Sequence, residues 1–233
     1  MKLKIRKLFC VGAVAIGTMA FTSSAIADTV VLNFAGLNGN SEEQPLDYYN
    51  GGAGGLGSTG GTNYGISFGS DALACSGQPG GICNTAQIPG GAGANTLFFL
   101  TGPGDIMNIA GGFTTGFSFY YSAANNPGSI GIWSGLDGTG TLLQTLALPV
   151  TGDGSGTAGC FGTNFCPYTP IGVTFAGTAE SVNFTGTANQ IGFADITFGS
   201  STAGGNVPEP VTLVLLASGL LGFSASRRKK NQA

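Results

Sequence analysis

The chain has 233 residues and no histidine, and its eight lysines and arginines are outnumbered by eleven aspartates and glutamates. All eight cations lie at positions 2–7 or 227–230, so residues 8–226 contain no Lys, Arg or His. This absence excludes a conventional serine or cysteine triad, a Schiff-base lysine and a cationic phosphate clamp from the middle of the chain, and its negative charge argues against a nucleic-acid partner.

The first predicted element is a secretory signal peptide over residues 1–27. An apolar segment follows the basic start, and Ala25 and Ala27 supply the small residues that signal peptidase requires. We expect cleavage after Ala27, which leaves Asp28 as the mature N-terminus. The alternative is an uncleaved signal anchor, but an apolar run of about 14 residues is shorter than the roughly 20 of a spanning helix.

Residues 28–206 are predicted to form one all-β domain. Short runs rich in β-branched and aromatic residues alternate with Gly, Asn, Pro and Asp, and no helical period is present. Many short strands with frequent turn signals favour an antiparallel β-sandwich resembling a jelly roll. The predicted strands are residues 29–34, 64–68, 96–101, 113–121, 129–133, 141–148, 171–175, 181–184 and 190–198. In the run 113–121 one parity holds Phe113, Thr115, Phe117, Phe119 and Tyr121, which predicts a core face and, for the other parity, a wetter face.

Four cysteines remain once the signal peptide is removed, in two local pairs. We predict disulfides between Cys75 and Cys83 and between Cys160 and Cys166, because an exported chain with an even cysteine count favours oxidised pairs. A four-thiolate zinc site is the weaker alternative, since neither pair has the spacing of a zinc knuckle.

Two further functions depend on aromatic and acidic side chains. Tyr64 and Trp133 are candidates for stacking on sugar rings, as in a carbohydrate-binding module, although a lone Trp among strand aromatics is more often a core residue. A glycoside hydrolase would need paired carboxylates. Glu42, Glu43 and Glu180 are the candidates for that pair, but we expect them to be solvated acids, because charged side chains are mostly exposed. We favour a protein without enzymatic activity.

The last predicted strand contains a change of register. Ile191 and Phe193 share one parity, whereas Ile196 and Phe198 share the other. Either both faces of this strand are covered, or a β-bulge near Asp195 shifts the register. A bulge at the sheet edge would make Asp195 a candidate ligand for a structural calcium ion. We favour a solvated acid at a strand kink, because calcium needs six to eight oxygen ligands and only one is identified. No other cofactor is expected.

The C-terminal segment is predicted to be a short transmembrane helix with a basic stop. Pro208 and Pro210 suit the entrance of a helix, and residues 211–226 carry no charge. The four cations that follow would remain on the cytoplasmic side of the inner membrane, with the domain outside. These cations are Arg227, Arg228, Lys229 and Lys230.

Pro208-Glu209-Pro210, the apolar helix with Gly219-Leu220-Leu221-Gly222 and the basic end resemble the PEP-CTERM sorting signal of Gram-negative bacteria, over residues 207–233. The resemblance implies recognition by an exosortase, a membrane-embedded cysteine protease or transpeptidase that cuts near the Pro-Glu-Pro element. It further implies delivery to the cell surface or extracellular matrix in bacteria that make exopolysaccharide and biofilm. An ordinary C-terminal anchor is the alternative.

The segments Asn63-Tyr64-Gly65-Ile66-Ser67-Phe68 and Gln190-Ile191-Gly192-Phe193 also resemble a recurrent ectodomain of PEP-CTERM proteins. Such domains are similar to carbohydrate-binding jelly rolls whose last strand often carries an Asp-Asn pair. This chain has Ala194-Asp195 at that position, so the resemblance does not assign a metal ligand there. The expected partners are signal peptidase, an exosortase, the inner membrane during transit and exopolysaccharide.

Overall fold

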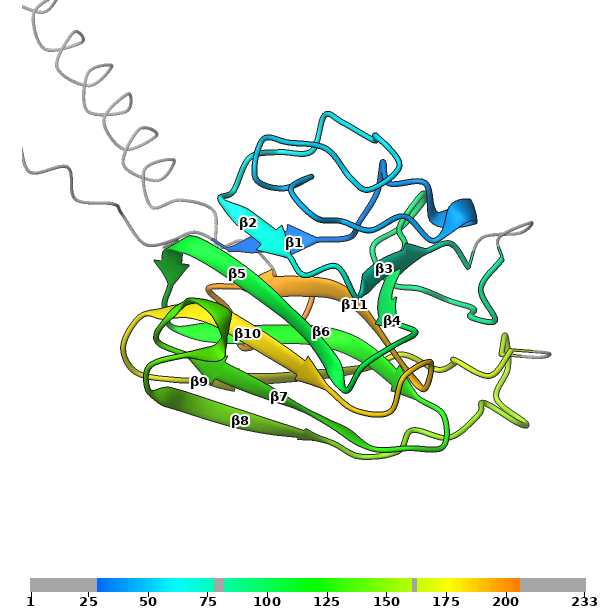
Figure 1. Cartoon of the computed structure of the whole chain (residues 1–233). Coiled ribbons are helices and arrows are strands. Elements are labelled where there is room, and N and C mark those ends of the chain that lie inside the picture. The colour runs from blue at the N-terminus through cyan, green and yellow to red at the C-terminus, as the bar shows by residue number, and fades with distance from the viewer. Residues whose placement is uncertain (1–28, 78–81, 161–162, 206–233) are drawn as a thin grey trace, which may run out of the picture.

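The computed structural model describes residues 29–77, 82–160 and 163–205, which form an all-β domain (Figure 1). The predicted signal cleavage site at Ala25, Ala27 and Asp28 lies outside the described residues. The Pro208-Glu209-Pro210 element, the predicted helix 211–226 and the basic tail 227–230 also lie outside them. No helix within the described residues is long and apolar enough to cross a membrane.

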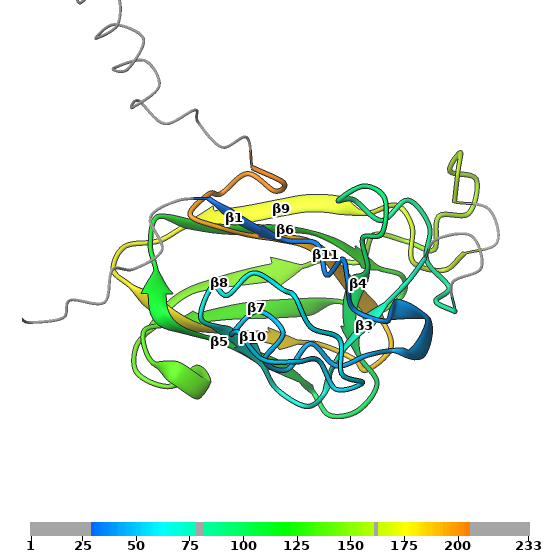
Figure 2. The ribbon, with the colours of Figure 1, turned by 90° about the horizontal axis from the view of Figure 1, so that it is seen from above.

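Two antiparallel sheets face each other (Figures 1 and 2). The β11 sheet has the order β3 (Ala72–Cys75), β4 (Thr96–Phe99), β11 (Ile191–Phe198), β6 (Gly116–Ala123) and β9 (Thr169–Thr174), and β1 (Val30–Leu32) pairs with β11. The β10 sheet has the order β2 (Ile66–Phe68), β5 (Gly104–Phe113), β10 (Ala179–Thr185), β7 (Gly128–Trp133) and β8 (Leu142–Leu148). Strands β4 to β11 follow the order of a jelly roll, β4-β11-β6-β9 against β5-β10-β7-β8, which confirms the predicted sandwich.

The core between the sheets is dominated by phenylalanine rings. Phe184 of β10 and Phe193 of β11 meet across the sandwich with ring centroids 5.0 Å apart at 67°, and Phe113 of β5 meets Phe198 of β11 at 5.0 Å and 84°. These edge-to-face contacts are the preferred geometry of aromatic pairs. All four rings are buried, so they hold the two sheets in register.

The predicted strand at 113–121 is wrong in one respect, because it is two strands. β5 ends at Phe113, Thr115 adopts a left-handed backbone with φ of 80°, and β6 begins at Gly116 on the opposite sheet. The predicted wetter face of β6 is also wrong, since Ser118 and Ser122 are buried. The segment 199–205 covers this face, and Ser118 Oγ donates a hydrogen bond of 2.9 Å to the carbonyl of Ser200.

Strand β11 combines both alternatives that its sequence pattern offered. Its ladder with β6 shifts register between Ala194 and Thr197, and Asp195 has a φ of 48°, so a β-bulge is present. Every residue of the strand is also buried. β4 pairs at Phe193, whereas β1 pairs from Ile196 onward, so β11 is a central strand and the bulge does not lie at a sheet edge.

Both ends of the described domain meet at one end of the sandwich. A Cβ atom added to Gly205 would lie 2.8 Å from Cγ2 of Thr29, and the chain leaves the domain on one side at both termini (Figure 1). Phe198, the last residue of β11, pairs there with Val30. The first residue of β11, Ile191, is roughly 23 Å away along the strand, at the opposite end.

Candidate functional site

A groove of about 310 Å³ lies at the end of the sandwich opposite the termini. Its floor is the outer surface of the β11 sheet, where Thr96 and Phe98 of β4 lie beside Gly192 of β11. Its walls come from loops far apart in the sequence. We call it the disulfide-loop groove, and its lining is Glu42, Ile82, Cys83, Asn84, Thr85, Thr96, Phe98, Leu100, Ala124, Asn125, Asn164, Phe165, Tyr168, Asn189, Gln190, Ile191 and Gly192.

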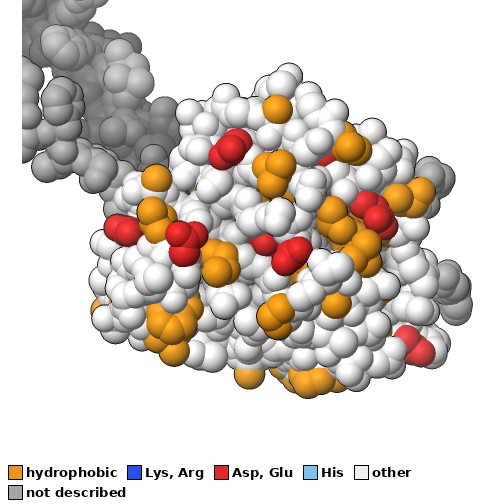
Figure 3. Space-filling model, viewed as in Figure 1, with side chains coloured by type: hydrophobic (Ala, Val, Ile, Leu, Met, Phe, Trp, Pro, Cys, Tyr) orange, Lys and Arg blue, Asp and Glu red, His pale blue; other side chains and the backbone are white. Residues whose placement is uncertain are grey.

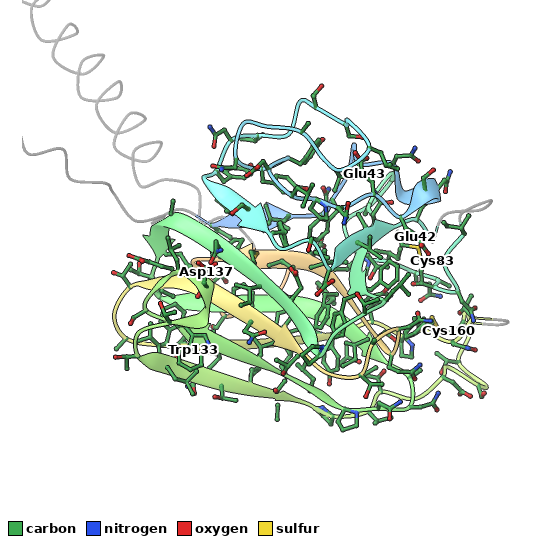
Figure 4. All side chains as sticks on the ribbon, in the orientation of Figure 1. Glu42, Glu43, Cys83, Trp133, Asp137 and Cys160 are labelled. Atoms are coloured by element: carbon green, nitrogen blue, oxygen red, sulfur yellow. A yellow bond between two sulfur atoms is a disulfide. The ribbon has the colours of Figure 1, made fainter. Side chains whose placement is uncertain are left out.

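Both predicted disulfides are present and shape the walls of this groove. The Cα atoms of Cys75 and Cys83 are 5.9 Å apart, and those of Cys160 and Cys166 are 5.5 Å apart. The two stapled loops contact each other, because the amides of Asn164 and Phe165 donate to the carbonyl of Asn84 at 3.2 and 3.1 Å. Figure 4 shows Cys83 and Cys160 at the same end of the molecule. Each loop therefore braces the other.

Tyr168 is fixed on the groove floor by its hydroxyl group. The hydroxyl donates to Oγ1 of Thr96 at 2.8 Å and lies 3.0 Å from Oγ1 of Thr85. Burial raises the pKa of Tyr168 to about 12, although these two hydrogen bonds oppose the rise. A Cβ atom at Gly192 would lie 2.9 Å from the same hydroxyl, so this glycine leaves room for it. The ring therefore has one defined orientation.

Amide side chains are the main polar groups of the groove. Asn125, Asn164 and Asn189 are exposed, and their side chains have no hydrogen-bond partner among the described residues. Gln190 differs, because its Oε1 accepts from Nδ2 of Asn126 at 3.0 Å and its Nε2 donates to the carbonyl of Asn189 at 2.8 Å. Three amides are thus available to a ligand, each with a donor and an acceptor.

Glu42 is the single acidic residue of the groove lining. Its neighbour Glu43 is fully buried instead of solvated, so that expectation was wrong. The Glu43 carboxylate accepts from the amides of Asn38, Leu56 and Ser58, at 2.6, 3.0 and 3.0 Å. Burial raises the pKa of Glu43, but these hydrogen bonds and one from the Ser58 hydroxyl together outweigh burial and hold that pKa below its usual value. Glu43 holds the loop together and does not line the groove.

The two predicted stacking residues do not meet. Tyr64 is half-buried and stacks on Tyr49 with ring centroids 6.4 Å apart, beside a separate hollow of about 190 Å³. Trp133 is half-buried at the end of β7, where its indole covers Gly131. Figure 4 shows Trp133 far from Cys83 and Glu42, so neither predicted residue lines the disulfide-loop groove.

The calcium candidate Asp195 lies under loops, with Gly90 against its Oδ1 atom. Asp195 is 7% exposed, its Oδ1 has no hydrogen-bond partner, and burial raises its pKa. No group of three or more His, Cys, Asp or Glu side chains arranged to hold a metal ion occurs within residues 29–77, 82–160 and 163–205. Asp195 thus belongs to no such group within these ranges, and a calcium ion at the bulge stays a prediction.

A second hollow, of about 450 Å³, lies beside β5 and is lined by three aspartates. Oδ1 of Asp137 accepts from Nδ2 of Asn108 at 2.7 Å, and Oδ1 of Asp71 accepts from the Thr101 hydroxyl at 3.0 Å. Asp105 shares the strand parity of the core residues and is 7% exposed. Burial raises the pKa of Asp105 to about 7, although backbone hydrogen bonds oppose this rise.

Charge is distributed sparsely over the surface. On the face shown in Figure 3 the acidic side chains are scattered and the hydrophobic side chains form small separate patches. The described residues contain no Lys, Arg or His. The domain therefore offers no site for an anionic ligand that depends on a cation.

Comparison with known families identifies the segment that follows this domain. Residues 206–229 match the PEP-CTERM protein-sorting motif. This chain carries a PEP-CTERM sorting motif. The motif marks an exported protein that is processed by an exosortase, and it begins directly after the last described residue, Gly205. A search of curated proteins finds no match to this PEP-CTERM chain.

Three solved structures are distantly similar to the domain. The K2 cleaved adhesin domain of Lys-gingipain matches with a TM-score of 0.42 and 12% identity, over 73% of this chain and 98% of that chain. A family 6 carbohydrate-binding module of Cellvibrio mixtus lichenase 5A, in complex with cellotriose, matches with 0.33 and 16%, over 50% and 86%. The CBM22-1 and GH10 modules of Clostridium thermocellum xylanase 10B, complexed with xylohexaose, match with 0.30 and 13%, over 57% and 26%.

Proposed function

We propose that the mature protein is a non-enzymatic domain delivered to the cell surface or extracellular matrix of a Gram-negative bacterium. The observation that carries this proposal is the PEP-CTERM motif at residues 206–229, which begins directly after the last described residue, Gly205. Signal peptidase would remove residues 1–27. The tail from Arg227 to Lys230 would hold the precursor in the inner membrane until the exosortase cuts near Pro208-Glu209-Pro210.

Intact mass of the protein from its native cell tests this route. We expect a mature mass that lacks residues 1–27 and residues 211–233. The Glu209→Ala variant should accumulate as a longer species, because the acidic residue between the prolines is the most distinctive group of the motif. Glu180→Gln, within the folded domain, is the matched control and should be processed normally. A wild-type mass that still contains residues 211–233 would contradict the proposal.

The absence of catalysis is part of the proposal and has its own support. The disulfide-loop groove contains one carboxylate, Glu42, whereas glycoside hydrolysis uses two carboxyl groups about 5–9.5 Å apart. Glu43 is enclosed by its own hydrogen bonds, and Glu180 lies on β10 away from the groove lining. All four described cysteines are in disulfides. Release of reducing ends from a polysaccharide, lost on Glu42→Gln, would contradict this.

A second candidate function is carbohydrate binding, which would tie the exported domain to exopolysaccharide in a biofilm. The observation that favours it is the disulfide-loop groove, where unpaired amides surround a fixed tyrosine ring. Fractionation of a native biofilm tests it. We expect the mature protein to remain with the polysaccharide after a high-salt wash, since a neutral contact is insensitive to salt. Complete release by salt would contradict this function.

A further inference from the structure

We propose that the disulfide-loop groove binds a short stretch of a neutral polysaccharide chain. At about 310 Å³ the groove is at the lower end of the range of about 300–1,000 Å³ that is typical of small-ligand pockets. It therefore suits a short segment of a longer chain better than a large folded partner. This inference deepens the carbohydrate-binding function proposed above and rests on it, whereas the proposed export decides only where the protein would meet its ligand.

The polar groups of the groove match the hydroxyl groups of a sugar. A hydroxyl both donates and accepts a hydrogen bond, and so does a carboxamide side chain. Asn125, Asn164 and Asn189 carry three such amides, from the β6–β7, β8–β9 and β10–β11 loops, and no described residue occupies them. Loops from three connections thus converge on one ligand position.

The apolar groups supply the second half of sugar recognition. Tyr168 and Phe165 are half-buried rings, and Leu100 exposes 41% of its surface at the same groove. Rings of this kind pack against the C–H face of a sugar, while the amides form hydrogen bonds with the hydroxyl groups at its edge. Because two hydroxyl contacts hold Tyr168 and a disulfide holds the loop of Phe165, little side-chain freedom is lost on binding.

The negative charge of the domain favours a neutral polysaccharide over an acidic one. The described residues carry nine carboxylates and no cation, and Glu42 lies in the groove itself. A polysaccharide of uronic acids would be repelled there and would find no arginine or lysine as a counter-charge. A neutral glycan avoids this cost.

The floor of the groove also argues against an extended peptide. Peptides that add to a sheet need a strand with a free edge, whose main-chain groups supply most of the affinity. β4 is paired with β3 on one side and β11 on the other, so the floor offers no free edge. The recognition groups of the groove are side chains, which suits a glycan.

Affinity electrophoresis of the full-length protein in detergent micelles tests the inference. Native gels would contain one neutral polysaccharide each, from a panel of β-glucan, mannan, xylan, galactan, dextran and the producer's own neutral polymer, with alginate as the acidic comparison. We expect retardation by at least one neutral polymer and none by alginate. Phe165→Ala should weaken that binding about tenfold, and Asn125→Ala and Asn164→Ala about three- to tenfold each.

Matched controls separate the groove from the rest of the surface. Asn50→Ala removes an exposed amide elsewhere, and Trp133→Ala removes the aromatic residue at the other end of the domain. Both should bind as the wild type does. The inference is overturned if no neutral polymer retards the protein, if the groove variants bind normally, or if the groove binds denatured casein instead. The processed mass of the groove variants should stay normal, so failure of glycan binding is distinguishable from failure of sorting.

Discussion

Two buried carboxylates have opposite electrostatic surroundings. Glu43 accepts hydrogen bonds from three backbone amides and the Ser58 hydroxyl, which favours its charged form. Asp105 is buried and leaves Oδ2 without a hydrogen-bond partner, which favours its protonated form. Neither environment was predictable from the sequence, because the Glu42-Glu43 pair before Pro45 and Asp105 after Gly104 both have the pattern of solvated acids. The two residues therefore give opposite contributions to the pH dependence of stability.

Replacement of Asp105 by Asn should stabilise the protein above neutral pH. The folded-state pKa of Asp105 is raised to about 7 from 3.8, so its contribution to stability is fully present below pH 3.8 and is lost as pH rises through 7. Asn keeps an acceptor for the backbone amides and never ionises. We expect Asp105→Asn to gain about 1–3 kcal/mol at pH 8 and little at pH 4. Urea unfolding followed by the fluorescence of Trp133 measures this, and equal stability of both proteins at pH 8 would contradict it.

Replacement of Glu43 by Gln should have the opposite pH dependence. The folded-state pKa of Glu43 lies below 4.5, so its contribution is present above pH 4.5 and is lost as pH falls through the folded-state pKa. We expect Glu43→Gln to cost about 2–3 kcal/mol at pH 7, because one amide group would face the backbone donors, and less at pH 3. The adjacent Glu42→Gln is the matched control in the same unfolding experiment. A loss that is equal at both pH values would argue against a role of the charge.

Strands were predictable where their residues alternate and are β-branched or aromatic. The predicted runs 129–133, 141–148 and 190–198 agree with β7, β8 and β11 within one residue at each end. β5 was missed over residues 104–112, because its Gly, Asp and Asn residues resemble turn signals although tertiary pairing with β2 and β10 makes it a central strand. For such a segment, tertiary pairing and not local sequence determines whether a strand forms.

The disulfides were predictable from cysteine spacing, whereas the groove that they shape was not. Asn84 and Asn164 are 80 residues apart and meet only because the two stapled loops contact each other. In the sequence, Asn125 lies two residues before Pro127, Asn164 follows Thr163, and Asn189 lies in the run Gly186-Thr187-Ala188-Asn189, so all three have the pattern of turn residues. Of the aromatic residues available, only the fold shows that Tyr168 lines this groove while Tyr64 and Trp133 do not.

Removal of either disulfide should destabilise the domain, and removal of the second should also loosen the groove. A cross-link across a loop this short contributes about 2–3 kcal/mol by restricting the unfolded chain. We expect Cys160→Ser with Cys166→Ser to lose that much in urea unfolding and to increase hydrogen exchange at Asn164 and Phe165. The double variant Cys75→Ser with Cys83→Ser, measured in the same way, shows how much the other disulfide contributes. Unchanged exchange at Phe165 in both double variants would show that the loops are ordered without their disulfides.

The two ends of the sandwich differ, because one holds both termini of the described domain and the other holds the groove. Thr29 and Gly205 lie together at one end, where the sorting motif at residues 206–229 follows the domain, and the disulfide-loop groove lies at the other end of β11. An anchor or transpeptidation product formed near Pro208 would hold the first end and leave the groove facing outward. This arrangement suits a domain that presents its binding surface away from the cell.

The same molecule should be stabilised by low concentrations of salt. Residues 29–205 carry nine carboxylates and no cation, so their mutual repulsion is not relieved by ion pairs within this region. The Debye length falls from about 30 Å at 0.01 M salt to about 10 Å at 0.1 M salt. At the higher concentration, carboxylates that lie farther apart than about 10 Å therefore repel each other only weakly. We therefore expect the Tm of the processed protein to rise between 0.01 and 0.1 M NaCl at pH 8. The rise should be smaller at pH 4, where most carboxylates are protonated or partly so, and sucrose of equal osmolality serves as the uncharged control. A Tm that falls with NaCl would mean that attractive charge pairs dominate, which the sequence of this domain does not provide.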